Sequence, residues 1–565
     1  MDYLKKYNEW LNDDCYDQQT RDELMSIKDD DEEIKDRFYK SLEFGTAGLR
    51  GKIGAGTNRM NKYNIMKTTQ ALADTIKNYG DEAMKRGVSI SYDVRKFSKE
   101  FAEISANVLA SNGIKVYLSD DIRPTPMLSY SIRKFNCISG IMITASHNPK
   151  EYNGYKAYWE EGSQILEDKA NEILNNLDKI ESFTEVKIGD FEKLIADGKI
   201  EYFGENLDKD YFDDVLSLTI NDDNIDKNVK IVYTPLNGTG NRFVRHILDV
   251  RGFKNVYVVK EQENPDSNFT TVPYPNPENP EAFEYAINLG KEVGADLLLA
   301  TDPDADRTAV EVLSNGEYVF LDGNKIGALL TNYILSQRYE KDDLPENPAV
   351  VKSIVTGDLS AKIAKKYGVE MIETLTGFKN VCGKANEYEK TGEKSWVFGY
   401  EESIGYSYGT FVRDKDAVSS SMMISEMLAF YKKQGKTLID VLNDLYEEFG
   451  YHENSLSSVV LEGLDGQEKI ARIMEEFRHN PINEIGSTKL VETKDYDVNY
   501  KDYGTPRSNV LKYYYDDGSW YALRPSGTEP KIKLYIYSVA DSKEKAEQKV
   551  LDIEKIAKEK MMNVK

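Results

Sequence analysis

Cysteine and histidine are scarce in this chain of 565 residues. It contains three cysteines, Cys15, Cys137 and Cys382, and four histidines. An odd, scattered set of cysteines offers neither a disulfide framework nor a CxxC pair for a metal. Four histidines argue against a His-rich zinc site. These absences favour a reducing compartment, and we expect a cytoplasmic location.

Long hydrophobic runs and an excess of basic charge are also missing. Apolar runs such as residues 297–300 are far shorter than the roughly 20 residues that cross a bilayer. The first residues lack the apolar core of a signal peptide. Acidic residues number 97 against 73 basic ones, a net charge of −24. Because a general nucleic-acid binder needs a basic surface, we expect neither a nucleic-acid nor a membrane partner.

Strand, glycine-bearing loop and helix alternate along most of the chain. Residues 88–92, 229–233 and 349–355 are apolar strand patterns that run into polar or glycine-containing loops. Continuous apolar strands between helices are typical of parallel or mixed sheets covered on both faces. Three such blocks predict three similar α/β domains with mixed sheets.

The last part of the chain has a different pattern. Residues 508–515 and 520–523 flank the turn Asp516-Asp517-Gly518, which predicts a hairpin. Ile532, Leu534 and Ile536 alternate with Lys533, Tyr535 and Tyr537, which predicts a half-buried strand. A helix with an apolar stripe follows. We predict a smaller α+β domain here, and a four-domain chain around a central cleft. The predicted domains are residues 1–208, 209–323, 324–452 and 453–565.

The most specific motif is Thr301-Asp302-Pro303-Asp304-Ala305-Asp306-Arg307, directly after the strand pattern 296–300. Three carboxylates at alternate positions after a strand can converge on one hard cation, and oxygen ligands suit Mg²⁺ or Ca²⁺. An EF-hand begins with the same spacing but needs glycine at position six and glutamate at position twelve, where this chain has Arg307 and Leu313. An acidic turn with helix-capping aspartates is the alternative.

A second motif, Thr144-Ala145-Ser146-His147-Asn148-Pro149, follows the apolar strand pattern 138–143. A serine at such a turn is exposed and close to backbone N–H groups. The alternative is an ordinary serine-containing turn, since His147 is a neighbour only in sequence and no GxSxG motif is present.

Three more segments offer anion- or hydroxyl-binding groups. The glycine-rich stretch 44–56 carries Arg50 but matches no nucleotide fingerprint, so a flexible loop is equally open. The stretch 523–533 holds an arginine fork, two hydroxyls and free amides in one turn, which suits phosphate. Residues 399–405 place two glutamates and a serine between glycines, which suits sugar hydroxyls. A plain β-turn and a solvated charged loop are the respective alternatives.

Taken together, the segments TASHNP, DPDADR, GYEESIG and RPSGTEPKIK resemble the signatures of the α-D-phosphohexomutase superfamily, in the same order. The resemblance runs from about Glu43 to the C-terminus, and the FGTAGLRG opening is most similar to the phosphoglucomutase/phosphopentomutase branch. It implies one Mg²⁺ per chain, glucose 1,6-bisphosphate as activator, a small phosphosugar as the partner, and a monomer or weak dimer.

The resemblance also implies roles for matched residues. Ser146 would be the phosphoserine, and its phosphate would join Asp302, Asp304 and Asp306 around Mg²⁺. The remaining catalytic residues would be Lys156 as general acid/base, with Arg50, Arg307 and His147. The substrate-binding residues would be Thr376, Gly377, Lys379, Glu401, Ser403, Lys415, Arg524, Ser526, Gly527 and Thr528.

The implied activity is the interconversion of glucose 1-phosphate and glucose 6-phosphate through a bisphosphate that turns over in the cleft. A pentose phosphate substrate is the close alternative. Mannose is less favoured, because Phe378 and Ile404-Gly405 stand where dual-specificity members carry histidines. A metal-dependent phosphatase and a silent sugar-phosphate binder are the other classes. We also expect the C-terminal domain to close over the cleft, since a phosphoserine must be kept from water.

Overall fold

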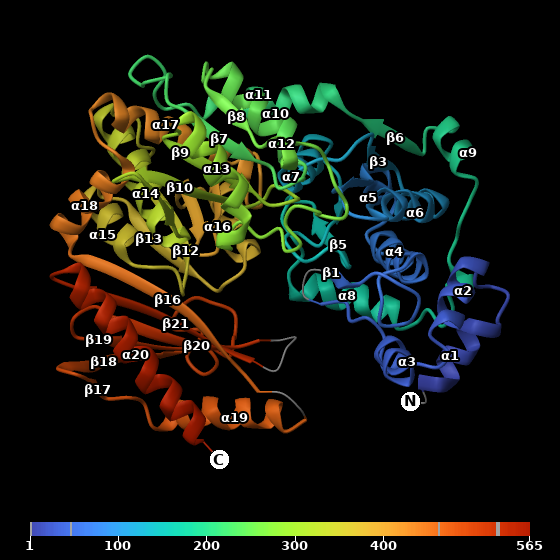
Figure 1. Ribbon diagram of the computed structural model, residues 1–565. Helices are drawn as coiled ribbons and strands as arrows, with labels where there is room; N and C mark the ends of the chain where they lie inside the picture. Colours follow the sequence, from blue (N-terminus) through green and yellow to red (C-terminus); the bar gives the residue numbers. More distant parts are fainter. Residues whose placement is uncertain (1–2, 46–47, 462–463, 527–530, 565) are drawn as a thin grey trace.

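The computed structural model describes residues 3–45, 48–461, 464–526 and 531–564. Four sheets organise the chain, and we call the unit around each one domain I, II, III or IV (Figure 1). The first three sheets mix parallel and antiparallel strands, and the fourth is antiparallel throughout. This confirms the predicted fold class. Within the described residues, no helix is both long and apolar enough to pass through a membrane.

Domain I has strand order β1-β5-β4-β2-β3-β6. Alternate residues of β4 point to opposite faces, so Ile141 and Ile143 pack among α4, α6 and α8 while Met142 packs against α7. Both faces are therefore covered, and all five residues of β2 and of β4 are buried. The strands are β1 (Gly48–Lys52), β2 (Val88–Tyr92), β3 (Val116–Ser119), β4 (Ser139–Ile143), β5 (Tyr152–Trp159) and β6 (Ile200–Phe203). The helices are α4 (Lys62–Lys77), α5 (Asp81–Arg86), α6 (Ser98–Ser111), α7 (Thr125–Lys134), α8 (Glu167–Leu177), η1 (Phe183–Glu185) and α9 (Phe191–Ala196).

Three helices precede domain I in the sequence: α1 (Tyr3–Asn12), α2 (Gln18–Ser26) and α3 (Asp31–Phe38). They build a small core with Trp10 and Phe38 at its centre, which also takes in Tyr63 of α4. The Arg37 guanidinium donates to the carbonyl of Ala55 at 3.2 Å. These helices therefore brace the loop that follows β1, the strand that carries Arg50.

Domains II and III share one continuous hydrophobic core. Helix α17 (Ala417–Lys433) is the reason, because it contacts β9, β10 and α11 of domain II as well as α14 and β15 of domain III. Every residue from Ala417 to Tyr431 is buried. A helix buried on every side over this length belongs inside such a core.

The sheet of domain II has order β11-β10-β9-β7-β8, and that of domain III has order β13-β12-β14-β15. Domain II comprises α10 (Glu205–Ser217), β7 (Ile231–Thr234), α11 (Gly240–Val250), β8 (Val256–Val258), α12 (Lys260–Glu263), η2 (Pro280–Phe283), α13 (Glu284–Val293), β9 (Leu297–Thr301), β10 (Thr308–Ser314) and β11 (Glu317–Leu321). Domain III comprises α14 (Gly323–Glu340), β12 (Pro348–Ser353), α15 (Leu359–Lys366), β13 (Glu370–Thr374), α16 (Phe378–Thr391), β14 (Ser395–Glu401), β15 (Gly405–Tyr408), α17 and α18 (Leu438–Phe449).

Domain IV is a six-stranded sheet of order β16-β21-β20-β19-β18-β17 with two helices. The predicted hairpin is the pair β19 and β20, and Ser542 caps the last helix. Its elements are β16 (Tyr451–Val460), α19 (Leu464–His479), β17 (Glu484–Ile485), β18 (Thr488–Asp495), β19 (Leu511–Tyr515), β20 (Trp520–Pro525), β21 (Lys531–Ala540) and α20 (Lys543–Asn563).

The prediction that β21 is half-buried is wrong. Tyr535 and Tyr537, expected on the solvent face, are buried at 4% and 2% exposure. They pack with Trp520 against Ile354 and Val355 of domain III. The second face of this sheet therefore forms the interface of domain IV with domain III.

Candidate active site

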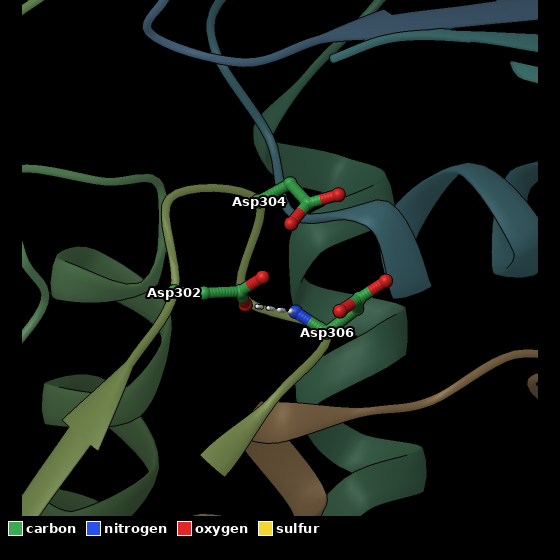
Figure 2. A group of neighbouring side chains, drawn as sticks. All are labelled: Asp302, Asp304 and Asp306. Carbon is green, nitrogen blue, oxygen red and sulfur yellow. Dashed lines mark hydrogen bonds between the residues drawn. The ribbon is translucent and has the colours of Figure 1, made fainter. Parts of the chain in front are cut away.

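The aspartate segment forms a tight turn between β9 and β10. One carboxylate oxygen of Asp302 accepts hydrogen bonds from the backbone N–H groups of Asp306 and Arg307, at 3.1 and 3.0 Å. Ala305 has a left-handed φ of 47°, which lets the chain reverse within the turn. The three carboxylates consequently converge on one side of the loop, as Figure 2 shows.

Burial makes this convergence costly unless a cation is present. One oxygen from each aspartate lies within 4.8 Å of the others, and all three residues are buried. Burial, with Asp304 and Asp306 beside it, raises the pKa of Asp302 well above its usual value. Among the described residues, Asp304 Oδ1 and Asp306 Oδ1 have no hydrogen-bond partner. Buried carboxylate oxygens with no partner fit a hard divalent cation.

The serine turn of domain I reaches this cluster directly. Ser146 Oγ donates a 2.8 Å hydrogen bond to Asp302 Oδ2, and the Ser146 N–H donates to Thr144 Oγ1 at 2.8 Å. Ser146 has a left-handed φ of 52° at the end of β4 and is 4% exposed. The structure thus brings together the serine and the three aspartates that the sequence pointed to.

His147 lies against the serine hydroxyl. Its Nδ1 is 3.1 Å from Ser146 Oγ, and its ring meets that of Tyr274 edge-on. Burial lowers the pKa of His147 well below 6.5, and Arg307 and Arg50 lower it further. The imidazole is therefore neutral at physiological pH.

Lys156 approaches from β5, which pairs with β1 so that Lys156 lies opposite Gly48. Its Nζ is 2.8 Å from Asp304 Oδ2 and 3.6 Å from Asp306 Oδ2. Burial alone would lower the pKa of this lysine, but Asp304 and then Asp306 raise it above 10.5. Lys156 is therefore a charged ammonium group beside the aspartate cluster.

Two arginines flank the serine. Arg307 Nη1 is 3.4 Å from Glu278 Oε2, and the pKa of Arg307 is raised above its usual value because Glu278 and Asp306 outweigh its burial. Arg50 Nη1 donates to Asn148 Oδ1 at 3.4 Å. Both guanidinium groups belong to segments next to Ser146, where charge on a transferring phosphoryl group would need neutralisation.

A cleft of about 520 Å³ opens beside these groups. All four domains line it, as the central cleft of the sequence prediction required. Its predicted members are His147 from domain I, Arg307 from domain II, Thr376, Gly377, Glu401 and Ser403 from domain III, and Arg524 from domain IV.

Glu401 is the carboxylate at the domain III wall of the cleft. The Gly377 N–H donates to its Oε1 at 2.7 Å, which ties two predicted substrate-binding segments together. Burial and the neighbouring Glu402 raise the pKa of Glu401 to about 7. Glu402 is itself held by the hydroxyls of Ser353 and Thr356. This wall can accept hydrogen bonds from sugar hydroxyls.

Two predicted substrate ligands, Lys379 and Lys415, make their contacts outside the lining of this cleft. Lys379 lines a separate cavity of about 220 Å³, and its Nζ donates to the carbonyl of Ile165 at 3.3 Å. Lys415 Nζ is 3.1 Å from Asp306 Oδ2 and 3.2 Å from Asp414 Oδ1, so it adjoins the aspartate cluster. Neither lysine is among the residues that line the cleft.

The domain IV wall of the cleft is basic. Arg524, Lys531 and Lys533 line it, and burial together with Arg524 and Lys531 lowers the pKa of Lys533. The Ser526 N–H donates to the Lys531 carbonyl at 2.8 Å. Gly527 and Thr528 lie outside the described residues. Positive charge concentrated at this wall favours an anion.

Several residues that build the site were not predicted from the sequence. Thr125, at the start of α7, donates from both its N–H and its hydroxyl to Asp304, at 2.8 and 2.9 Å. Asp93 and Arg95 lie beneath the serine turn, and Glu278 pairs with Arg307. The signal for Asp93 and Arg95 was present, because Asp93 directly follows a strand of the same sheet as the serine segment.

Comparison with protein families finds four matching models, one after another along the chain. They are described as phosphoglucomutase/phosphomannomutase alpha/beta/alpha domains I, II and III, at residues 41–184, 209–314 and 322–449, and the C-terminal domain, at residues 482–555.

Curated proteins with the same span are similar throughout. A phosphoglucomutase of Staphylococcus haemolyticus (strain JCSC1435) is 38% identical over 523 residues, 91% of this chain and 93% of that protein. A phosphoglucomutase of Staphylococcus aureus (strain MRSA252) is 37% identical over 544 residues, 94% of each chain.

Solved structures share the fold. A putative phosphomannomutase from Thermus thermophilus has a TM-score of 0.68 at 22% identity, covering 92% of this chain and 99% of that one. The open form of parafusin, a phosphoglucomutase from Paramecium, has a TM-score of 0.67 at 21% identity, covering 93% and 95%.

Proposed function

The chain belongs to the phosphoglucomutase/phosphomannomutase family of the α-D-phosphohexomutase superfamily, and on that premise we propose that it interconverts glucose 1-phosphate and glucose 6-phosphate through a phosphoserine at Ser146. The observation that carries the proposal is the 2.8 Å contact between Ser146 Oγ and Asp302 Oδ2. The names of the staphylococcal relatives support glucose phosphate as the substrate.

Ser146 gives and recovers the phosphoryl group. In the first half-reaction the bond between phosphorus and Ser146 Oγ breaks while a bond to a sugar hydroxyl oxygen forms. The proton lost by the sugar hydroxyl is balanced by one gained by the serine oxygen, and Lys156 is the proposed relay: its ammonium gives a proton to Ser146 Oγ and recovers one from the sugar hydroxyl. Neutral His147 lies within hydrogen-bond distance of the serine oxygen. Arg50 and Arg307 offset the charge of the transferring group. Asp302, Asp304 and Asp306 would hold Mg²⁺, which when bound neutralises phosphate oxygen charge.

The cleft binds the sugar in two orientations. The proposed contacts to sugar hydroxyls are Glu401, Ser403, Thr376 and Gly377, on the domain III wall of the cleft. Arg524, Ser526, Gly527 and Thr528 are the proposed contacts to the phosphate that is not reacting. A bisphosphate formed at Ser146 can turn round between these walls and return its other phosphate to the serine. Glucose 1,6-bisphosphate would therefore prime an enzyme that has lost its phosphate.

Lys379 and Lys415 have smaller parts in this proposal. Lys379 faces another cavity, so it would act on the cleft only through helix α16. Lys415 is bound to Asp306, so it would tune the aspartate cluster and not hold the sugar. Domain IV would still close over the cleft, because water in the cleft would hydrolyse the phosphoserine.

A coupled assay tests the proposal. Glucose 1-phosphate is supplied with Mg²⁺, with and without glucose 1,6-bisphosphate, and glucose 6-phosphate is followed through its dehydrogenase. We expect turnover that the bisphosphate stimulates. Parallel assays on ribose 1-phosphate and mannose 1-phosphate test the alternative sugars. Steady release of inorganic phosphate, with no mutase turnover, would identify a phosphatase and overturn the proposal.

A further inference from the structure

Arg95 holds the serine turn by its backbone. One terminal nitrogen donates to the carbonyls of Ser146 and Asn148, at 2.6 and 2.5 Å. The other donates to the carbonyls of Pro149 and Tyr152, at 2.8 and 3.1 Å. The side chain is completely buried. One guanidinium thus fixes four carbonyls of the segment that carries the reacting hydroxyl, a planar arrangement that a lysine ammonium does not reproduce.

Asp93 completes the support from the other side. It pairs with Arg95 at 3.3 Å and accepts the Thr144 hydroxyl at 2.6 Å. Thr144 Oγ1 in turn accepts the Ser146 N–H. The backbone of Ser146 is therefore held at both its N–H and its carbonyl. That restraint keeps the left-handed φ of 52°, a conformation that a non-glycine residue adopts only where its surroundings impose it.

Domain II covers Arg95 with Phe269. The Phe269 ring lies over the guanidinium with 5.0 Å between the Arg95 Cζ atom and the ring centroid, and Phe269 is 1% exposed. Phe269 also has a left-handed φ of 45°, which is unusual for so bulky a residue. Asp266 holds this turn by accepting the N–H groups of Asn268 and Thr270. A strained phenylalanine presented to a buried arginine links the docking of domain II to the serine turn.

We propose that Arg95 is a positioning residue for phosphoryl transfer, one that aims the Ser146 hydroxyl at the aspartate cluster and is clamped by Phe269 across the boundary between domains I and II. The inference rests on the proposed function, since it concerns the same serine. Arg95 acts through the serine backbone, and its four carbonyl contacts lie within residues 146–152. Loss of aim should therefore slow the chemical step and leave sugar binding nearly unchanged.

The test compares Arg95→Lys and Arg95→Ala with the wild-type enzyme. A displacement of about 1 Å at a reacting group costs on the order of 100-fold in rate. We expect both variants to lose about 100-fold in kcat, with KM for glucose 1-phosphate within about threefold of wild type. Guanidinium ion should restore part of the kcat of Arg95→Ala, while methylammonium should not. Circular dichroism and the melting temperature measure any unfolded fraction, and kcat is compared per folded molecule.

Arg86→Lys is the matched control. Arg86 also braces domain I by donating to two carbonyls, those of Asn136 and Cys137, and pairs with Glu160. It should keep wild-type kcat and KM. If the Arg95 variants do not fold, Phe269→Leu takes their place, with an expected three- to tenfold loss in kcat and an unchanged KM.

The inference is overturned if correctly folded Arg95→Lys keeps a kcat within threefold of wild type, or if correctly folded Phe269→Leu does so where Arg95 variants do not fold. A rise in KM without a fall in kcat also overturns it. Wild-type enzyme with no mutase turnover is a different result, because it rejects the proposed function before any variant is compared.

Discussion

The hydroxyl of Ser146 and the carboxylate of Asp302 are 2.8 Å apart although they are 156 positions apart in the chain. One comes from a strand end of the first sheet and the other from a strand end of the second. Their meeting places a nucleophile-bearing turn against a group of buried acids. Much of the site's behaviour follows from that contact.

Ser146→Ala should abolish turnover while leaving the fold intact. The side chain removed is small and makes its contacts within the site, so the melting temperature should stay close to that of the wild type. The loss of a group that carries the covalent intermediate costs on the order of 10⁴-fold or more. Intact mass after incubation with glucose 1,6-bisphosphate should show one added phosphate on the wild type and none on the variant. Retained turnover would exclude a phosphoserine.

Asp302→Asn should abolish the stabilisation of the protein by Mg²⁺. Ligand binding to the folded state alone adds about 2.7 kcal/mol at one hundred times the dissociation constant. Mg²⁺ should therefore raise the melting temperature of the wild type, and the variant should not respond. In chelator the variant should be at least as stable as the wild type, because burial and the neighbouring Asp304 already disfavour the charged Asp302. An equal Mg²⁺ response in both proteins would place the cation elsewhere.

Glu401 should give substrate affinity a pH dependence near neutrality. Its pKa is raised to about 7 by burial and by Glu402, so it is protonated below that pH in the free protein. As an acceptor for sugar hydroxyls it works best when ionised, and KM should fall as pH rises through 7. Glu401→Gln should remove this dependence, whereas the ionisation of the substrate phosphate affects both proteins alike and serves as the internal control.

Glu401 should also make the stability of the folded protein depend on pH, with a sign that its pKa fixes. The folded protein holds the Glu401 proton up to about pH 7, while an unfolded glutamate loses it near 4.5. The folded state therefore binds more protons between these values, and its stability falls as pH rises through this window. Measured against Glu401→Gln, the unfolding midpoint of the wild type in urea should decline from pH 4.5 to 7 and then level off. If the midpoint of the wild type rose relative to that of Glu401→Gln over this pH range, the raised pKa of Glu401 would be contradicted.

Arg524→Ala should weaken substrate binding more than it slows the chemistry. A hydrogen bond to a charged group contributes about 1.5–3 kcal/mol, which corresponds to a 10- to 100-fold rise in KM. Arg524→Lys keeps the positive charge but not the two-pronged guanidinium, so its KM should lie between those of the wild type and Arg524→Ala. A fall in kcat with unchanged KM would show that Arg524 serves the reacting phosphate.

Asp358→Asn should destabilise the interface between domains III and IV. Asp358 accepts from Lys352 of its own domain at 2.6 Å and from the Trp520 indole of domain IV at 2.7 Å. The Asp358 side chain is only 26% exposed, so its hydrogen bonds are largely shielded from water. We therefore expect the free energy of unfolding to fall by about 1.5–3 kcal/mol. Asp343→Asn, at a pair whose carboxylate is 69% exposed, is the control and should change stability by less than about 0.5 kcal/mol. Equal effects would show that the interface does not depend on this contact.

The fold class followed from the sequence because apolar periodicity reports which surfaces are buried. The strand at residues 88–92 and the apolar stripe of the last helix are examples. Periodicity does not say what covers a face, so Tyr535 and Tyr537 were assigned to solvent while they pack on domain III. The shared core around α17 was hidden for the same reason, since a helix buried on all sides carries no amphipathic signal.

The candidate site, too, could be predicted only in part. Ser146 and the aspartates lie at strand ends, where side chains of an α/β sheet gather, so sequence position was informative. Lys379 and Lys415 show the limit. Both stay predicted substrate ligands, but the sequence did not indicate that Lys379 lies at a separate cavity or that Lys415 is paired with Asp306. The position of Arg95 after a strand end was visible in the sequence, but its role was not, because its partners are backbone carbonyls.

Thr125 of domain I closes on Asp304 with both its backbone and its hydroxyl, across 179 positions of the chain. Synthesis on the ribosome starts at the amino end, so the serine turn emerges long before its acidic counterpart. A nascent chain that ends before Asp306 carries the proposed phosphate acceptor without the full set of groups that would orient it or bind a cation. Truncated products should therefore remain inert toward sugar phosphates, and the activity arises only once the second sheet has been translated and docked.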